Sequence, residues 1–126
     1  MRAEDVTILI GDNSVLARKQ LKDAIVSFGI SRILESSNGQ EAVDLYREHV
    51  PDIVFLSLLM PVKDGISAIS EIMEINPNAD IVVVSSMGTQ SQIKQTFQLG
   101  AKEFIQKPFH SQQIADVLQT RLEGSV

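Results

Sequence analysis

Short apolar runs alternate with segments of helical periodicity along the chain, and this alternation limits the possible folds more than any other feature. Four runs are strongly apolar, and a fifth is weaker, as expected of a strand at the edge of a sheet. The runs at 52–56 and 80–85 are almost continuously apolar, which indicates strands covered on both faces in a parallel sheet. The strong runs are 6–10 (VTILI), 52–56 (DIVFL), 80–85 (DIVVVS) and 103–106 (EFIQ), and the weak one is 32–36 (RILES).

Helical periodicity fills the segments between these runs. Three apolar stripes are clear: 17–28, stopped by Gly29; 66–73, stopped by Asn76-Pro77; and 114–122. Two shorter helices are predicted, one after Asn38-Gly39 and one around residues 93–97. Strand and helix therefore alternate five times.

This repeated pattern predicts an α/β fold with right-handed crossovers and helices on both sheet faces. For five strands we expect a doubly wound, flavodoxin-like parallel sheet in the order 2-1-3-4-5, with five helices. The strand order then reverses between the first and third strands, and ligands bind at the carboxyl ends of the strands at such a point. Functional residues are thus expected at Asp12-Asn13 and at Ser57.

Size and composition narrow the class of protein. A chain of 126 residues is expected to form one domain spanning 1–126, without an attached output domain. Its net charge of −5 argues against nucleic-acid and anionic-membrane partners. No apolar run approaches the roughly 18 to 20 residues of a membrane span, and no cysteine is present for thiol catalysis or disulfides. We therefore expect a cytoplasmic protein.

Polar side chains follow four of the expected strands. Asp12 and Asn13 follow the first, Ser57 follows the third, Ser85 ends the fourth and Lys107 follows the fifth. Because parallel strands end at the same edge of a sheet, these side chains should converge. Structural interpretations also remain open: Asp12, Asn13 or Ser14 could cap the first helix, and Ser85 and Ser86 could cap backbone groups in the turn before Gly88.

Several motifs in combination point to one family. The segments ILIGDNS, SNGQEAVDLY, PDIVFLSLLMPVKDG, IVVVSSMG and GAKEFIQKPF together extend over nearly the whole chain. With this spacing the chain resembles a response-regulator receiver domain, close to the single-domain chemotaxis type. The resemblance implies a signalling domain of a two-component phosphorelay and not an enzyme. In that family an aspartate after the third strand accepts a phosphoryl group from a histidine kinase.

The resemblance gives a role to each candidate residue. Asp12 matches the first acid of a Mg²⁺ site, and the backbone carbonyl of Leu59 would be a further ligand. Ser85 and Lys107 match the hydroxyl and the lysine that bind phosphoryl oxygens, and the Lys107-Pro108 peptide bond would be cis. Phe104 matches the aromatic switch position, although a phenylalanine there also fits a plain core role.

Two positions depart from the family pattern. Ser57 stands where the family has its phosphoacceptor aspartate, and Asn13 stands where it has a second acid. A serine hydroxyl is un-ionised at neutral pH and needs a base, for which the sequence offers only Asp12, expected to be exposed and a poor base. Mg²⁺ prefers hard, anionic ligands, so we expect no cofactor and weak metal binding at best. A contact between Lys107 and Asp12 is expected to hold the site together instead.

These observations predict an atypical receiver domain that acts by protein–protein binding without phosphorylation. The predicted partner face covers residues 90–119, which contain eight glutamines and include the last two helices and the strand between them. A homodimer through this face is a further option. Two alternatives stay open: residual phosphoacceptor or phosphatase-like activity at Ser57, and an anion- or ligand-sensing pocket at Lys107.

Overall fold

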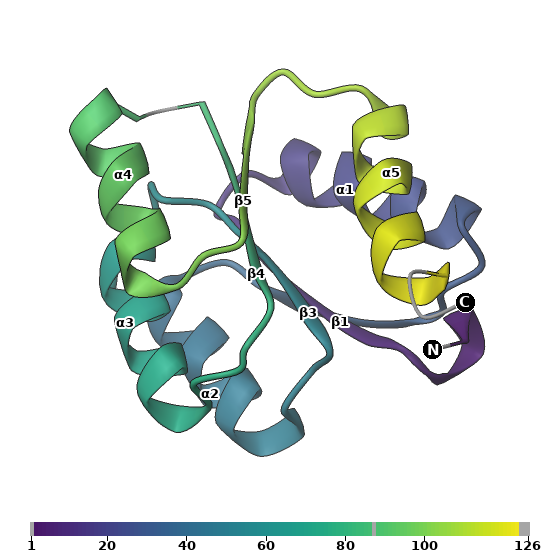
Figure 1. Cartoon of the computed structure of the whole chain (residues 1–126), viewed down its shortest axis with the longest axis horizontal. Helices are drawn as coiled ribbons and strands as arrows, with labels where there is room; N and C mark the ends of the chain where they lie inside the picture. The colour runs from purple at the N-terminus through teal and green to yellow at the C-terminus, as the bar shows by residue number, and fades with distance from the viewer. Residues whose placement is uncertain (1, 87, 124–126) are drawn as a thin grey trace.

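The computed structural model describes residues 2–86 and 88–123 (Figure 1). A 3-10 turn, η1 (Ala3–Asp5), precedes the first strand. The strands are β1 (Thr7–Gly11), β2 (Arg32–Ser36), β3 (Ile53–Leu56), β4 (Ile81–Ser85) and β5 (Glu103–Gln106). The helices are α1 (Val15–Ser27), α2 (Gly39–His49), α3 (Gly65–Ile75), α4 (Gln90–Leu99) and α5 (Ser111–Glu123).

The five strands form one parallel sheet in the order β2-β1-β3-β4-β5, as predicted. The predicted strands at 32–36 and 103–106 match β2 and β5. Of the others, β1 is shifted by one residue at both ends, and β3 and β4 begin one residue later than predicted. The least apolar of the predicted runs forms β2, which is an edge strand with β1 beside it on one side. Two of its residues are exposed. The sheet therefore has its order reversal between β1 and β3.

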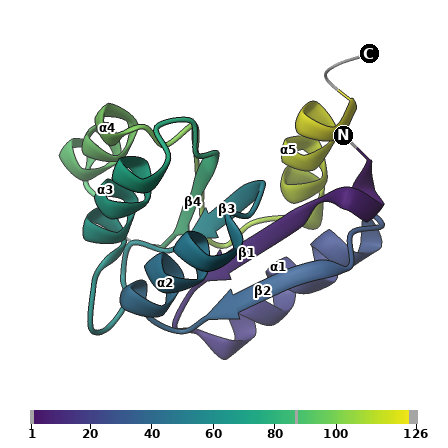
Figure 2. The same cartoon turned by 90° about the horizontal axis from the view of Figure 1, so that it is seen from below.

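Helices cover both faces of the sheet, with α1 and α5 on one side and α2, α3 and α4 on the other (Figures 1 and 2). Alternate residues of one strand enter different cores: Ile8 and Ile10 of β1 pack toward α1 and α5, whereas Leu9 packs toward α2 and α3. In the same way Phe55 and Val54 of β3 belong to opposite cores. Burial on both faces explains why these strands are continuously apolar.

Local hydrogen bonds fix where the helices begin. Ser14 caps α1, because its hydroxyl accepts a hydrogen bond from the backbone N–H of Ala17 at 3.2 Å. Asn38 and Asp64 cap α2 and α3 in the same way. The first helix ends before Gly29, whose φ of +100° suits glycine. Among the three cap candidates named from the sequence, Ser14 is the one that caps α1.

Arg121 ties the last turn of α5 to the amino end of the sheet. Its guanidinium donates two hydrogen bonds to Asp80, at 2.6 and 3.0 Å, and lies 3.0 Å from a carboxylate oxygen of Glu103. Burial disfavours the charged form, but hydrogen bonding and charge from Asp80 and Glu103 outweigh it, so the pKa of Arg121 is raised above its ordinary value. The contact anchors α5 at the end opposite the candidate site.

Among residues 2–86 and 88–123, no helix has the length and apolar character required to cross a membrane.

Candidate functional site

The carboxyl ends of β1, β3, β4 and β5 bring the sequence-predicted residues to one edge of the sheet. The backbone N–H of Ser57 donates to the carbonyl of Gly11 at 2.8 Å, and that of Lys107 donates to the carbonyl of Ser85 at 3.0 Å. These bonds continue the sheet pairing one residue beyond the strands. Asp12 and Ser57 consequently line one cavity of about 490 Å³ together with Lys107.

Asp12 lies at the floor of this cavity with only 1% of its surface exposed. The expectation of an exposed carboxylate is therefore wrong, because the β1–α1 turn and the Lys107 side chain cover it. One carboxylate oxygen accepts from the backbone N–H of Ser14 at 2.9 Å, and the other accepts from Lys107 Nζ at 2.5 Å. Arg18 holds the main-chain carbonyl of Asp12 at 2.6 Å. Both carboxylate oxygens are thus already hydrogen-bonded.

Lys107 follows the edge strand β5 and pairs with Asp12, which follows β1. Its side chain is 19% exposed and pairs with Asp12 at the end of β1, although β4 and β3 lie between β5 and β1 in the strand order. The contact between Lys107 and Asp12 that the sequence predicted is present. The peptide bond between Lys107 and Pro108 is cis, as the resemblance implied.

Ser57 lies beside this ion pair and is 4% exposed. Within the described part of the chain its hydroxyl has no hydrogen-bond partner, although the residue lines the cavity. A tight backbone approach fixes its position: a Cβ on Gly65 would overlap the carbonyl oxygen of Ser57, and the N–H of Gly65 donates to the carbonyl of Leu58 at 2.9 Å. The hydroxyl is thus held in place without a protein partner among these residues.

The loop between β3 and α3 presents apolar side chains to solvent next to the cavity. Leu59, whose carbonyl was predicted as a metal ligand, lines the cavity with a side chain that is 61% exposed. Val62 has a φ of +69°, unusual for a β-branched residue, and is 83% exposed. At the start of α1, Val15 and Leu16 are 71% and 65% exposed. Leu16 and Leu59 line the cavity, and Val15 and Val62 are exposed apolar residues close to them in the chain.

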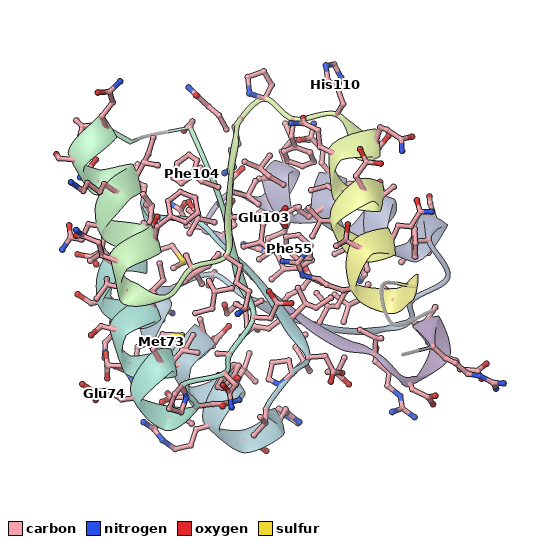
Figure 3. All side chains as sticks on the ribbon, viewed as in Figure 1. Phe55, Met73, Glu74, Glu103, Phe104 and His110 are labelled. Carbon is pink, nitrogen blue, oxygen red and sulfur yellow. The ribbon has the colours of Figure 1, made fainter. Side chains whose placement is uncertain are left out.

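The remaining predicted residues occupy different surroundings. Asn13 is exposed and lines the cavity, where it contributes no charge. Ser85 is buried, and its neighbour Ser86 lines the cavity wall instead. Phe104 is half-buried against the core on the α3 side, where a Cβ on Gly88 would come 3.2 Å from its ring (Figure 3). The structure thus brings Asp12, Asn13, Ser57, Leu59 and Lys107 together and places Phe104 apart from them.

Three cavity residues were not singled out from the sequence. Leu16, Gln20 and Phe109 line the wall formed by α1 and the β5–α5 loop. The sequence pattern around 17–28 predicted the helix but not that its exposed residues would face the end of β5. In the described part of the chain, no cluster of three or more His, Cys, Asp or Glu side chains has the arrangement of a metal site.

Comparisons with known proteins agree on one family. The sequence model of the response regulator receiver domain matches residues 8–119. The chemotaxis protein CheY of Thermotoga maritima is 44% identical over 111 residues, which cover 88% of this chain and 92% of that protein. CheY of Bacillus subtilis is 40% identical over 115 residues, covering 91% and 96% of the two chains.

Solved structures of CheY and of CheY-like receiver domains also match this chain. A chain of the CheX-CheY-BeF3-Mg²⁺ complex from Borrelia burgdorferi matches with a TM-score of 0.86 and 38% identity, covering 98% of this chain and 91% of that one. A CheY-like receiver domain of Methanospirillum hungatei, at 14% identity and a TM-score of 0.88, shows the shared fold alone. The chain belongs to the response regulator receiver domain family of two-component signalling, and within that family it is CheY-like.

Proposed function

We propose that this chain is an atypical receiver domain that works in the cytoplasm by binding a protein partner without an aspartyl-phosphate switch. The proposal rests chiefly on one observation: the end of β3 carries Ser57, and next to it Lys107 is paired directly with Asp12. Receiver domains are generally signalling domains without enzymatic activity, which supports a binding role. Three further reasons follow, two from the cavity and one from the surface of α4, β5 and α5.

The first reason is the chemistry of Ser57. A serine hydroxyl attacks a phosphoryl donor only when a neighbouring base removes its proton. Asp12 is the nearby carboxylate, but its oxygens already accept hydrogen bonds from Ser14 and Lys107. Its negative charge is also directly paired with an ammonium group. This arrangement disfavours a phosphoacceptor or phosphatase-like role for Ser57.

The second reason concerns Mg²⁺. The ion prefers octahedral coordination by hard oxygen atoms, including one or two carboxylates. Among the described residues, the cavity offers one carboxylate, that of Asp12, and the amide of Asn13 and the hydroxyl of Ser57 are neutral. Lys107 lies where it would repel a cation. These residues do not fit Mg²⁺, and we propose that the ion binds weakly or not at all.

The third reason concerns the surface of α4, β5 and α5, which includes residues 90–119. The eight glutamines in this range are all exposed, at positions 90, 92, 95, 98, 106, 112, 113 and 119. Gln92 and Gln113 accept hydrogen bonds at the starts of α4 and α5, so part of the set has a local role. Phe97 of α4 is 45% exposed among them. A neutral polar surface with an exposed aromatic ring suits protein–protein contact, with another protein or with a second copy of the chain.

The test is the intact mass of the protein after incubation with phosphoramidate and Mg²⁺. The proposal predicts an unmodified chain. A phosphoryl adduct that maps to Ser57 would overturn it and would favour a residual phosphoacceptor. The binding role is tested separately by replacing Phe97 with serine, which should weaken partner binding without changing the fold.

A further inference from the structure

We infer that the cavity at the carboxyl end of the sheet binds a small organic anion with an apolar body, held without metal and without a covalent bond. The inference rests on the proposed function, since it assigns a non-covalent ligand to a site that we propose is no longer phosphorylated. Three observations lead to it: a cavity-lining hydroxyl without a protein partner among the described residues, hydrogen-bond donors at Lys107 and at the start of α1, and an apolar wall.

The hydroxyl of Ser57 is the first observation. Ser57 is 96% buried, lines the cavity and has no partner for its side chain among residues 2–86 and 88–123. The hydroxyl oxygen itself is not sealed off from the cavity, so a solute in the cavity can reach it. A ligand oxygen in the cavity would supply the missing partner.

The cavity also presents hydrogen-bond donors. The ammonium group of Lys107 has three N–H bonds, and Asp12 takes one of them at 2.5 Å. The cavity also borders the start of α1, where the N–H groups of Val15 and Leu16 have no intrahelical acceptor. The positive end of the helix dipole lies at the same place. Because the carboxylate of Asp12 is already satisfied, the remaining groups favour a ligand with several acceptor oxygens and a negative charge.

Part of the cavity wall is apolar, which distinguishes this site from one that binds an inorganic anion through polar groups alone. Leu16 and Ala17 of α1, Leu59 of the β3–α3 loop, and Pro108 and Phe109 of the β5–α5 loop all line it. Leu16 and Leu59 are 65% and 61% exposed, so a ligand would bury surface that is now in water. A volume of about 490 Å³ lies in the range of small-molecule sites. The structure therefore points to a carboxylate, phosphonate or sulfonate attached to an aromatic or aliphatic group.

The experiment compares two probes that share an acidic group and differ in apolar size: phenylphosphonate and methylphosphonate. Neither can phosphorylate Ser57, since a carbon–phosphorus bond does not transfer a phosphoryl group. Each probe is titrated into the protein without Mg²⁺, up to about 10 mM, and amide chemical shifts are followed by NMR. Phenylphosphonate should bind at least about tenfold more tightly, because its ring contacts the apolar wall.

Substitutions test whether the two probes bind in the cavity. Ser57→Ala should weaken both probes by roughly fivefold, the effect of one hydrogen bond, without loss of stability, since the hydroxyl bonds to no described residue. Leu59→Ser should weaken phenylphosphonate alone. Val26→Ser is the matched control, because Val26 is 51% exposed on α1 but lies outside the cavity, and it should change neither affinity.

The outcomes separate this inference from the proposed function. Equal affinities for the two probes, or no binding by either, would overturn the inference while leaving the proposed function intact. Shift changes confined to residues outside the cavity would also overturn it. Failure of the proposed function would be seen independently, as a phosphoryl adduct in the mass experiment with phosphoramidate.

Discussion

Lys107 Nζ lies 2.5 Å from Asp12 Oδ2, and the two residues are 95 positions apart in the chain. The contact links the end of β5 to the end of β1 across the ends of β3 and β4. Both residues line the cavity that Ser57 also lines. A direct ion pair therefore occupies the centre of the candidate site and joins strands that are not neighbours in the sheet.

Breaking this pair should destabilise the fold. Lys107→Ala leaves the carboxylate of Asp12 buried without its cationic partner, and we expect a loss of about 3 kcal/mol in the free energy of unfolding, measured by urea denaturation. Asp12→Ala should cost a similar amount, since it removes the acceptor for Ser14 as well. The double variant should lose less than the sum of the two single losses.

Asp44→Ala is the control for this cycle. Asp44 pairs with Arg47 on the surface of α2, with both side chains more than half exposed, so its loss should be close to zero. Strictly additive effects of Asp12→Ala and Lys107→Ala would contradict a coupled pair.

Magnesium should have little effect on stability. A ligand stabilises a folded protein by RT ln(1 + [L]/Kd), which is near zero when the concentration is far below Kd. The melting temperature should therefore be the same with and without low millimolar Mg²⁺, measured by calorimetry. A rise of several degrees would show that the single carboxylate at Asp12 is enough to hold the ion.

Two substitutions should restore phosphorylation at position 57 in two steps. Ser57→Asp alone restores a carboxylate at the end of β3 but leaves the neutral Asn13 beside it, so phosphorylation by phosphoramidate should stay low. The double variant with Asn13→Asp should bind Mg²⁺ more tightly and label to a greater extent. Equal labelling of the single and double variants would show that Asn13 does not limit the site.

The fold could be predicted almost completely because its signals are local. Continuous apolar runs identified β3 and β4, and the weak run at 32–36 identified the edge strand β2. The stop signals at Gly29 and Asn76 agree with the ends of α1 and α3. Strand ends differed by one residue because sheet pairing, and not the apolar pattern, decides where a strand begins and ends.

The site was less predictable because its surroundings come from distant segments. The strand order placed Asp12, Ser57 and Lys107 at one edge, but it did not indicate that Lys107 would bury Asp12. The hydrogen bond from Arg18 to the carbonyl of Asp12 also depends on how α1 packs against the turn. Nor did any pattern indicate that Leu16 and Leu59 would face the same cavity. The functional roles of these residues remain predictions.

Gly65 should be intolerant of a side chain. A Cβ at this position would overlap the carbonyl oxygen of Ser57 and approach the backbone of Leu58, so the end of β3 would have to move. Gly65→Ala should cost about 1–3 kcal/mol or more in unfolding free energy. Gly88→Ala is the comparison, because its nearest neighbours are side chains at 3.2 Å or beyond, and it should cost less. The reverse ranking would contradict this account of the β3–α3 loop.

Arg121→Lys should destabilise the attachment of α5. Lysine keeps the charge but cannot make the two hydrogen bonds to Asp80, so we expect a loss of about 1–2 kcal/mol. Since the pKa of Arg121 is raised in the folded protein, its contribution is present at neutral pH and is lost as pH rises through that pKa. The wild-type contribution should therefore be constant across neutral pH. Arg47→Lys, at an exposed pair, should have no measurable effect.

The central claim, that the site no longer accepts a phosphoryl group, is tested most directly by intact mass spectrometry after incubation with phosphoramidate and Mg²⁺. The Ser57→Asp, Asn13→Asp double variant, treated in parallel, verifies that the reagent and the fold are competent. We predict an unmodified wild-type chain beside a phosphorylated double variant. A wild-type adduct mapped to Ser57 would contradict the account and would make this cavity a working phosphorylation site.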